Sequence, residues 1–163
     1  MEHRTTLLLG GNQGDMTATL QRAIELLEER VGEVVATSRI YRSEAWGFAC
    51  EAEFYNQAVV CSTQLEPEPL LDATQSIETE LGRNRERERR LKSLSGERYC
   101  SRTMDIDIMF YDDEVISTPR LSVPHPLMQQ REFALEPMCE IEPQRVHPTL
   151  GLSLKDMYEN LKR

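Results

Sequence analysis

The sequence predicts an α+β fold of the ferredoxin-like kind, an α/β sandwich with a mainly antiparallel sheet and additional C-terminal elements. Three observations predict it. The expected elements follow in the order strand, helix, strand, strand, helix, strand, which is a split βαβ arrangement. The chain has 163 residues, so residues 1–163 are expected to form a single domain. Apolar residues make up 39% and charged residues 29%, as is typical of folded globular proteins.

The first strand and the first helix are expected near the start of the chain. Residues 5–11 (TTLLLGG) form a short apolar run that ends in glycines, as a buried strand does. Asp15 is placed as the N-cap of a helix, because apolar residues from Leu20 to Val31 recur at steps of three and four. Gly32 is expected to end this helix.

Two further strands are expected at residues 34–42 and 54–62, which are rich in β-branched and aromatic side chains. The connection between them is longer than a hairpin needs, so residues 43–53 are a candidate functional loop. Pro67 or Pro69 can open a second helix, which Gly82 is expected to end.

The second half begins with a basic, serine-containing stretch that predicts a mobile loop at residues 83–102. The clearest strand of the chain, residues 103–111 (TMDIDIMFY), follows it. The remaining expectations are a turn at 112–113, a short return strand at 114–117, an extended segment at 119–126 and helices near 132–140 and 154–161.

The net charge of −9 hides a local inversion. Residues 82–102 contain eight basic and three acidic residues, a charge of +5, so the remainder carries −14. A basic island in an acidic protein predicts one local anionic partner, such as a polyphosphate, and no general nucleic-acid partner.

No apolar run approaches the ~20 residues that a membrane span needs. The chain also starts without the basic and apolar regions of a signal peptide, so a cytoplasmic location without membrane contact is expected. The four cysteines contain no C-x-x-C pair and are predicted to be free thiols.

Asp105 and Asp107 are the strongest candidates for metal ligands. Alternate residues of a strand share a face, with Cα atoms roughly 6.6 Å apart, while Ile106 and Ile108 face the core. Two adjacent carboxylates repel each other unless a cation lies between them, and oxygen ligands suit Mg²⁺. The alternative is a solvated acidic face on an edge strand; the nearby basic loop favours the metal.

Arginine suits polyphosphate because its planar fork matches phosphate oxygens. Arg102, three residues before Asp105, is the best placed for a ligand, whereas the arginines at 87, 89 and 90 are expected to pair with neighbouring glutamates at the surface. Residues 120–126 (RLSVPHP) add Arg120, Ser122 and His125, and Arg131 follows; a lone histidine is nevertheless more often structural.

Trp46, Phe54 and Asn56 surround the long loop. Two aromatic rings can sandwich a flat heterocycle, and an amide offers both a donor and an acceptor to a ring edge. Packing of Trp46 and Phe54 in the core is an equally open alternative.

Walker-type and Rossmann-type phosphate loops are absent from the sequence. An RNA-binding module and a different magnesium-dependent nucleotide enzyme are the rival interpretations.

Residues 98–109 (RYCSRTMDIDIM) resemble the hallmark segment of the 6-hydroxymethyl-7,8-dihydropterin pyrophosphokinases of the folate pathway. The resemblance covers nearly the whole chain. It continues in LGGN at 9–12, YRS at 41–43 with Trp-Gly at 46–47, FYN at 54–56, TQSIE at 74–78, LGR at 81–83, LSVPHP at 121–126, REF at 131–133 and VHPTLG at 146–151.

The resemblance implies a ferredoxin-like protein that transfers pyrophosphate from ATP to the hydroxymethyl group of the pterin and releases AMP. It implies that Asp105 and Asp107 hold two Mg²⁺ ions and that Arg83 and Arg102 close over the triphosphate. The implied pterin pocket consists of Ser43, Trp46, Phe54, Asn56 and Phe133. The implied ATP site consists of Gln75, Glu78, Arg98, Tyr99, Arg102, Ile108, Arg120, Ser122, His125 and Arg131. Both substrates are small molecules, and no protein partner is implied.

Three positions depart from the family pattern. Cys100 stands where the family usually has glycine, and Glu44 and Ala45 replace common prolines. The loop between Arg83 and Arg102 is also longer than in compact members. None of these departures touches Asp105 or Asp107.

Overall fold

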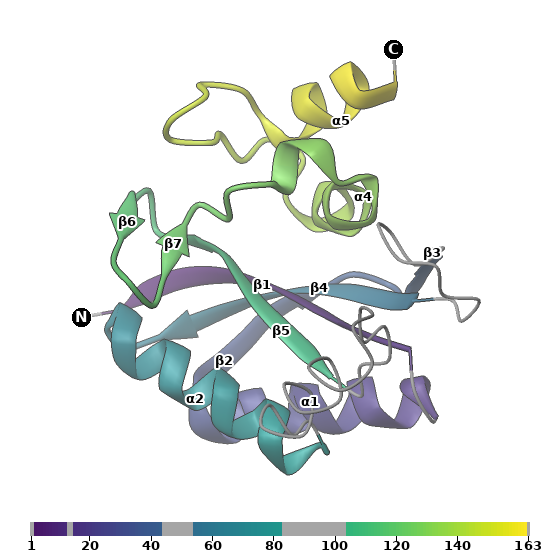
Figure 1. Cartoon of the computed structure of the whole chain (residues 1–163), viewed down its shortest axis with the longest axis vertical. Coiled ribbons are helices and arrows are strands. Elements are labelled where there is room, and N and C mark those ends of the chain that lie inside the picture. Colours follow the sequence, from purple (N-terminus) through teal and green to yellow (C-terminus); the bar gives the residue numbers. More distant parts are fainter. Residues whose placement is uncertain (1, 13–14, 44–53, 83–103, 163) are drawn as a thin grey trace, which may run out of the picture.

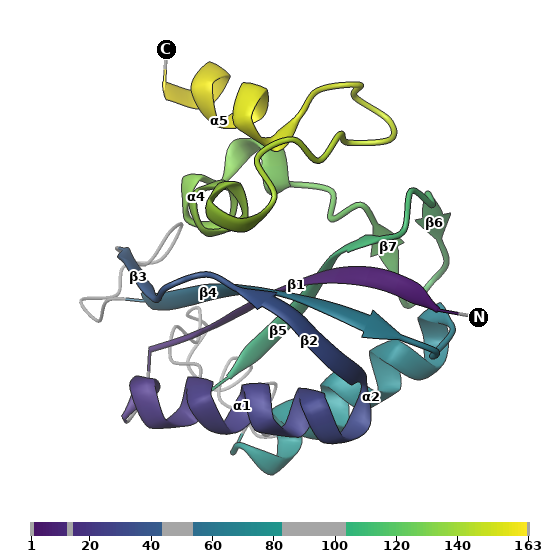
Figure 2. The same ribbon diagram turned by 180° about the vertical axis from the view of Figure 1, so that it is seen from behind.

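The computed structural model describes residues 2–12, 15–43, 54–82 and 104–162. Its fold combines helices with an antiparallel sheet whose main path has the order β2-β4-β1-β5, with β3 paired to β4. Helices α1 and α2 cover one face of the sheet and α4 and α5 the other (Figures 1 and 2). The elements are β1 (His3–Gly11), α1 (Met16–Arg30), β2 (Gly32–Thr37), β3 (Tyr41–Ser43), β4 (Phe54–Thr63), α2 (Pro67–Glu80), β5 (Asp105–Tyr111), β6 (Ile116–Ser117), β7 (Ser122–Val123), a 3-10 helix (Met128–Gln130), α4 (Glu132–Ile141) and α5 (Leu154–Lys162).

The first helix has the ends that the sequence predicts. The Asp15 side chain accepts a hydrogen bond from the Ala18 N–H at 3.2 Å, which caps the helix. Chain reversal at the other end brings Gly32 against β4. A Cβ atom on Gly32 would lie only 2.0 Å from the Ser62 carbonyl oxygen, so this position requires glycine.

The strand expected at residues 34–42 is divided in two. Ser38 is buried between β2 and β3, and its own Oγ accepts the Ala58 N–H at 2.9 Å. The Ser38 N–H donates to the Ala58 carbonyl at 2.8 Å. The Ser38 side chain thus takes the place of one backbone acceptor in the pairing with β4. The prediction of one uninterrupted strand at 34–42 was therefore wrong.

The sheet separates two apolar clusters. Leu7 and Leu9 of β1 pack with α1 and α2, while Leu8 packs with Met138 of α4 and Met157 of α5. A register shift between Thr6 and Leu7 interrupts the pairing with β5. Odd-numbered residues of β1 face α1 and α2, and the residues paired with them on β4 and β5 face the same side.

The C-terminal part contains the two predicted helices, now α4 and α5. The short return strand is β6, and it pairs with β7, which lies within the extended segment expected at 119–126. Cys61 and Cys139, the cysteines in the described ranges, are free thiols as predicted. No helix among the described residues is long and apolar enough to cross a membrane.

Candidate active site

Three strands bring one residue each into a single row. Gly10 of β1 lies opposite Asn56 of β4 on one side and opposite Asp105 of β5 on the other. Residues paired across antiparallel strands share a face of the sheet. In the adjacent row, Leu8 and Ala58 pack in the α4–α5 cluster, so the row through Gly10 also faces α4.

The two aspartates lie on this face with half-exposed side chains. Asp107 is the partner of Leu8, one row further along than Asp105. Ile106 and Ile108 point the other way and are 5% exposed in the core against α1 and α2, which confirms the predicted alternation. Asp105 and Asp107 therefore present oxygen atoms side by side, a donor set that fits Mg²⁺.

Glu78 of α2 is attached to the same strand. Its side chain is 2% exposed, and its Oε2 accepts a hydrogen bond from the Ile106 N–H at 2.7 Å. Because β5 is the last strand on the sheet path formed by the described residues, this N–H lies on the edge of that sheet. The buried carboxyl group thus holds the backbone at Ile106, between the two aspartates, a contact that the sequence did not reveal.

Asn56 is buried, with 4% of its surface exposed, next to Tyr41 of β3. Phe54 lies two residues earlier on β4 and opposite Ser43 of β3. Phe133, in the first turn of α4, packs at the margin of the α4–α5 cluster. Four of the five residues of the implied pterin pocket thus belong to β3, β4 and the start of α4.

His125 and Arg131 belong to the connection between β7 and α4. The His125 N–H donates to the Met109 carbonyl of β5 at 3.1 Å, which holds this segment against the strand. Burial lowers the pKa of His125, the Arg131 charge lowers it further, and Asp105 opposes both. The Arg131 guanidinium also lies 5.7 Å from the centre of the Phe133 ring. His125 therefore lies within electrostatic reach of both Arg131 and Asp105.

The other implied ATP residues are more dispersed. Arg120 is exposed and pairs with Asp72 at 2.6 Å and Glu68 at 3.2 Å on α2, and it donates to Gln75 at 3.5 Å. Ser122 is exposed on β7, and the Ile108 side chain is buried in the core. Arg120 and Gln75 are thus brought together.

Trp46, Arg83, Arg98, Tyr99 and Arg102 lie outside the described residues, as do the loops expected at 43–53 and 83–102 apart from Ser43. The three departures at Glu44, Ala45 and Cys100 do so as well.

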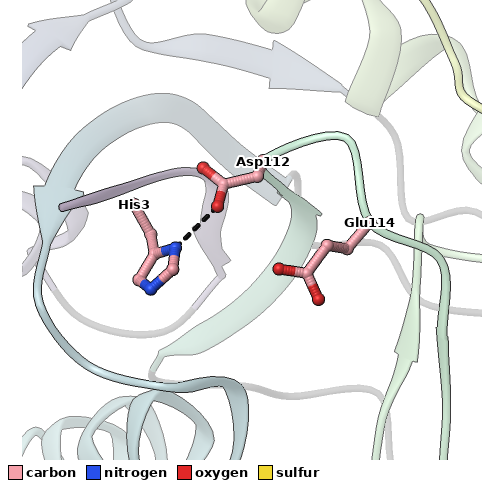
Figure 3. Close-up of side chains that lie close together, drawn as sticks. All are labelled: His3, Asp112 and Glu114. Atoms are coloured by element: carbon pink, nitrogen blue, oxygen red, sulfur yellow. Dashed lines mark hydrogen bonds and ion pairs between the residues drawn. The ribbon is translucent and has the colours of Figure 1, made fainter. Parts of the chain in front are cut away.

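A separate cluster of possible ligand atoms lies at the other end of β1 (Figure 3). It contains His3, Asp112 and Glu114. The His3 Nδ1 is 2.6 Å from the Asp112 carboxylate, and its Nε2 is 3.4 Å from Glu66. Both ring nitrogens already have carboxylate partners, so this cluster joins the start of β1 to the turn after β5.

Sequence reasoning missed Gly10 as a member of the site. In the sequence, the glycine pair at 10–11 indicates only the end of a strand and forms part of a family motif. Its signal was a glycine inside an apolar strand, where this residue weakens the strand unless another group approaches closely.

Comparison with known proteins extends these observations. Residues 6–143 match the family model described as 7,8-dihydro-6-hydroxymethylpterin-pyrophosphokinase (HPPK). The 2-amino-4-hydroxy-6-hydroxymethyldihydropteridine pyrophosphokinase of Aquifex aeolicus is 40% identical over 91% of this chain and 86% of its own length. The Bacillus subtilis protein of the same name is 39% identical over 86% of this chain and 79% of its own.

Among solved structures, Plasmodium falciparum HPPK-DHPS with pteroate matches with a TM-score of 0.78 and 16% identity. That match covers 98% of this chain but only 44% of the Plasmodium chain, so this chain spans less than half of it. At this identity the likeness concerns the fold. The extent of the family match and the identity to the bacterial proteins decide the assignment, and the chain belongs to the 7,8-dihydro-6-hydroxymethylpterin-pyrophosphokinase family.

Proposed function

We propose that this chain transfers pyrophosphate from ATP to the hydroxymethyl group of 6-hydroxymethyl-7,8-dihydropterin, giving AMP and the pterin diphosphate in folate biosynthesis. The observation that carries the proposal is the row Asn56–Gly10–Asp105 on one face of the sheet. Two strand spacings separate its ends, roughly 10 Å. The amide proposed to bind the pterin ring and the carboxylate proposed to hold the metal are therefore close enough to contact the two substrates of one reaction.

In the proposed reaction the pterin hydroxymethyl oxygen attacks the β-phosphorus of ATP. The bond between the β-phosphorus and the oxygen that bridges it to the α-phosphorus breaks, and that oxygen leaves with AMP. The alcohol proton passes to solvent water. The protein's part is positioning and charge neutralisation.

Asp105 and Asp107 are proposed to hold Mg²⁺, two ions by the family resemblance. The half-exposed, oxygen-only donor set supports this assignment. When bound, Mg²⁺ supplies positive charge to the phosphate oxygens. Glu78 keeps the intervening backbone in place through the Ile106 N–H.

Asn56 is proposed to hydrogen-bond the pterin ring edge, with Phe133, Phe54, Ser43 and Trp46 completing the pocket. The burial of Asn56 supports this role, because a buried amide discriminates strongly between ring edges that satisfy it and those that do not.

The nucleotide is proposed to lie between α2 and the segment before α4. Its contacts would come from Gln75, Glu78, Arg98, Tyr99, Arg102, Ile108, Arg120, Ser122, His125 and Arg131, with Arg83 and Arg102 acting on the phosphates. The Ile108 side chain is buried in the core, so we propose that Ile108 contacts the nucleotide through its backbone. The proximity of Arg120 to Gln75 supports a shared role for these two residues.

The architecture is proposed to be a ferredoxin-like sandwich formed by residues 1–163 as one domain. The strand order β2-β4-β1-β5 supports it, because α1 connects β1 to β2 and α2 connects β4 to β5 while β4 lies between β1 and β2.

The test is incubation with ATP, Mg²⁺ and 6-hydroxymethyl-7,8-dihydropterin, with the nucleotide product separated by chromatography. AMP formed in equal amount to pterin diphosphate is expected, and chelation of Mg²⁺ should abolish it. Asp105→Asn and Asp107→Asn should each lower turnover more than tenfold, about 1.4 kcal/mol, with an unchanged melting temperature. Asp113→Asn, in the exposed turn after β5, is the matched control and should keep full activity. ADP as product, or full turnover of either aspartate variant, would contradict the proposal.

A further inference from the structure

Gly10 occupies the centre of the proposed site, between the residue assigned to the pterin and the residue assigned to the metal. We propose that Gly10 is a positioning residue for pterin specificity, because the absence of its side chain gives the Asn56 amide its place on the sheet. The proposal rests on the proposed function for the identity of the ligand, whereas the geometry is independent of it.

The space above Gly10 is already occupied. A Cβ atom at this position would lie 2.6 Å from the Asn56 Oδ1, 3.6 Å from the Asn56 Cγ and 3.3 Å from the Tyr55 carbonyl oxygen. Carbon and oxygen atoms that are not bonded do not approach to 2.6 Å, so alanine here would displace the amide. Asn56 is buried and its side chain is short, which leaves the amide little freedom to move aside.

The backbone of Gly10 gives no other reason for glycine. The described glycines with positive φ are Gly32, Gly82 and Gly151, and Gly10 is not among them. Gly10 is paired within β1 on both sides, where glycine weakens a strand and offers no side chain for packing. Glycine therefore makes the strand less stable at this position. The space that the Asn56 amide needs explains why glycine is present.

The consequence is selective for one substrate. Displacing the amide changes the hydrogen-bonding edge offered to the pterin, whereas the described residues assigned to ATP lie on α2, on β5 and between β6 and α4, and Asn56 is not among them. A general loss of stability would instead weaken both ligands in the same way. Gly10→Ala should therefore separate the two affinities.

The test measures binding of the dihydropterin and of a non-hydrolysable ATP analogue with Mg²⁺ by calorimetry. Gly10→Ala is expected to weaken pterin binding at least tenfold and nucleotide binding less than twofold. Gly151→Ala is the control for a destabilising glycine substitution: its φ of +71° disfavours alanine, yet a Cβ there has no atom within 4 Å. It should lower the melting temperature and leave both affinities unchanged.

The double variant Gly10→Ala/Asn56→Ala decides whether Gly10 acts through Asn56. If it does, pterin binding by the double variant equals that of Asn56→Ala alone, and Gly10→Ala lowers the melting temperature less in that background. Independent losses that multiply, wild-type pterin binding by Gly10→Ala, or a double variant that does not fold would each overturn the proposal. If wild-type protein neither binds nor converts the pterin, the proposed function fails, while the stability comparison still tests the contact between Gly10 and Asn56.

Discussion

Truncation of Glu78 tests how the metal-bearing strand is held. Glu78→Ala removes the acceptor of the Ile106 N–H, a 2.7 Å hydrogen bond made by a side chain that is 2% exposed. The N–H is left on a buried strand edge, and an unsatisfied buried donor costs about 1–3 kcal/mol. For a domain of this size, about 2 kcal/mol lowers the melting temperature by about 4–8 °C.

The loss should extend from stability to metal binding. Ile106 lies between Asp105 and Asp107, so a looser strand edge also loosens the spacing of the two carboxylates. Urea unfolding followed by circular dichroism gives the free energy of unfolding, and the Mg²⁺ dependence of AMP formation gives the apparent metal affinity. We expect Glu78→Ala to lower both.

Two variants serve as controls for Glu78→Ala. Glu78→Gln keeps an oxygen acceptor of the same reach and should cost less than half as much. Glu80→Ala, on the same helix, removes an exposed partner of Arg30, and surface ion pairs contribute at most about 1 kcal/mol. The reasoning is wrong if Glu78→Ala unfolds like wild type, or if the glutamine variant is as unstable as the alanine variant.

Two further predictions concern other parts of the sheet. Ser38→Ala should lower the free energy of unfolding by about 1–3 kcal/mol in urea titrations, because the buried Ala58 N–H loses its acceptor; an unchanged midpoint would contradict this. Asp112→Asn should lower stability at pH 7 by about 1 kcal/mol or less, since this partly exposed carboxylate accepts hydrogen bonds from the Arg4 N–H and His3. Burial raises the pKa of Asp112, but these bonds outweigh burial and hold it below its usual value, so the contribution is present above about pH 4 and is lost as pH falls through the lowered pKa. Melting curves of both proteins should converge in acid, and a pH-independent gap would contradict the assignment.

Local features of the fold could be predicted because their causes are local. The N-cap at Asp15, the proline that opens α2 at Pro67 and the alternation that buries Ile106 depend on residues within a few positions. That Asp105 and Asp107 share one face of the strand was likewise predictable from their spacing.

Other features depend on partners far along the chain. Ser38 interrupts a β-rich segment because of Ala58, 20 residues later, and no pattern around Ser38 signals that bond. Glu78 meets Ile106 from another element, 28 residues away. Within α2, Glu78 follows the apolar Ile77, and only the tertiary structure shows that its carboxyl group is buried.

The row Asn56–Gly10–Asp105 belongs to this second class, since it exists only through the register of three strands. A slip of one residue in β4 would turn Asn56 to the opposite face, against α1 and α2. Packing prevents that slip, because Leu8 and Ala58 meet each other in the α4–α5 cluster while Leu9 and Val59 belong to the cluster on the other face. The apolar residues that form the core therefore also align the polar ones, and the separation between the proposed pterin and metal sites is set by the core of the sheet.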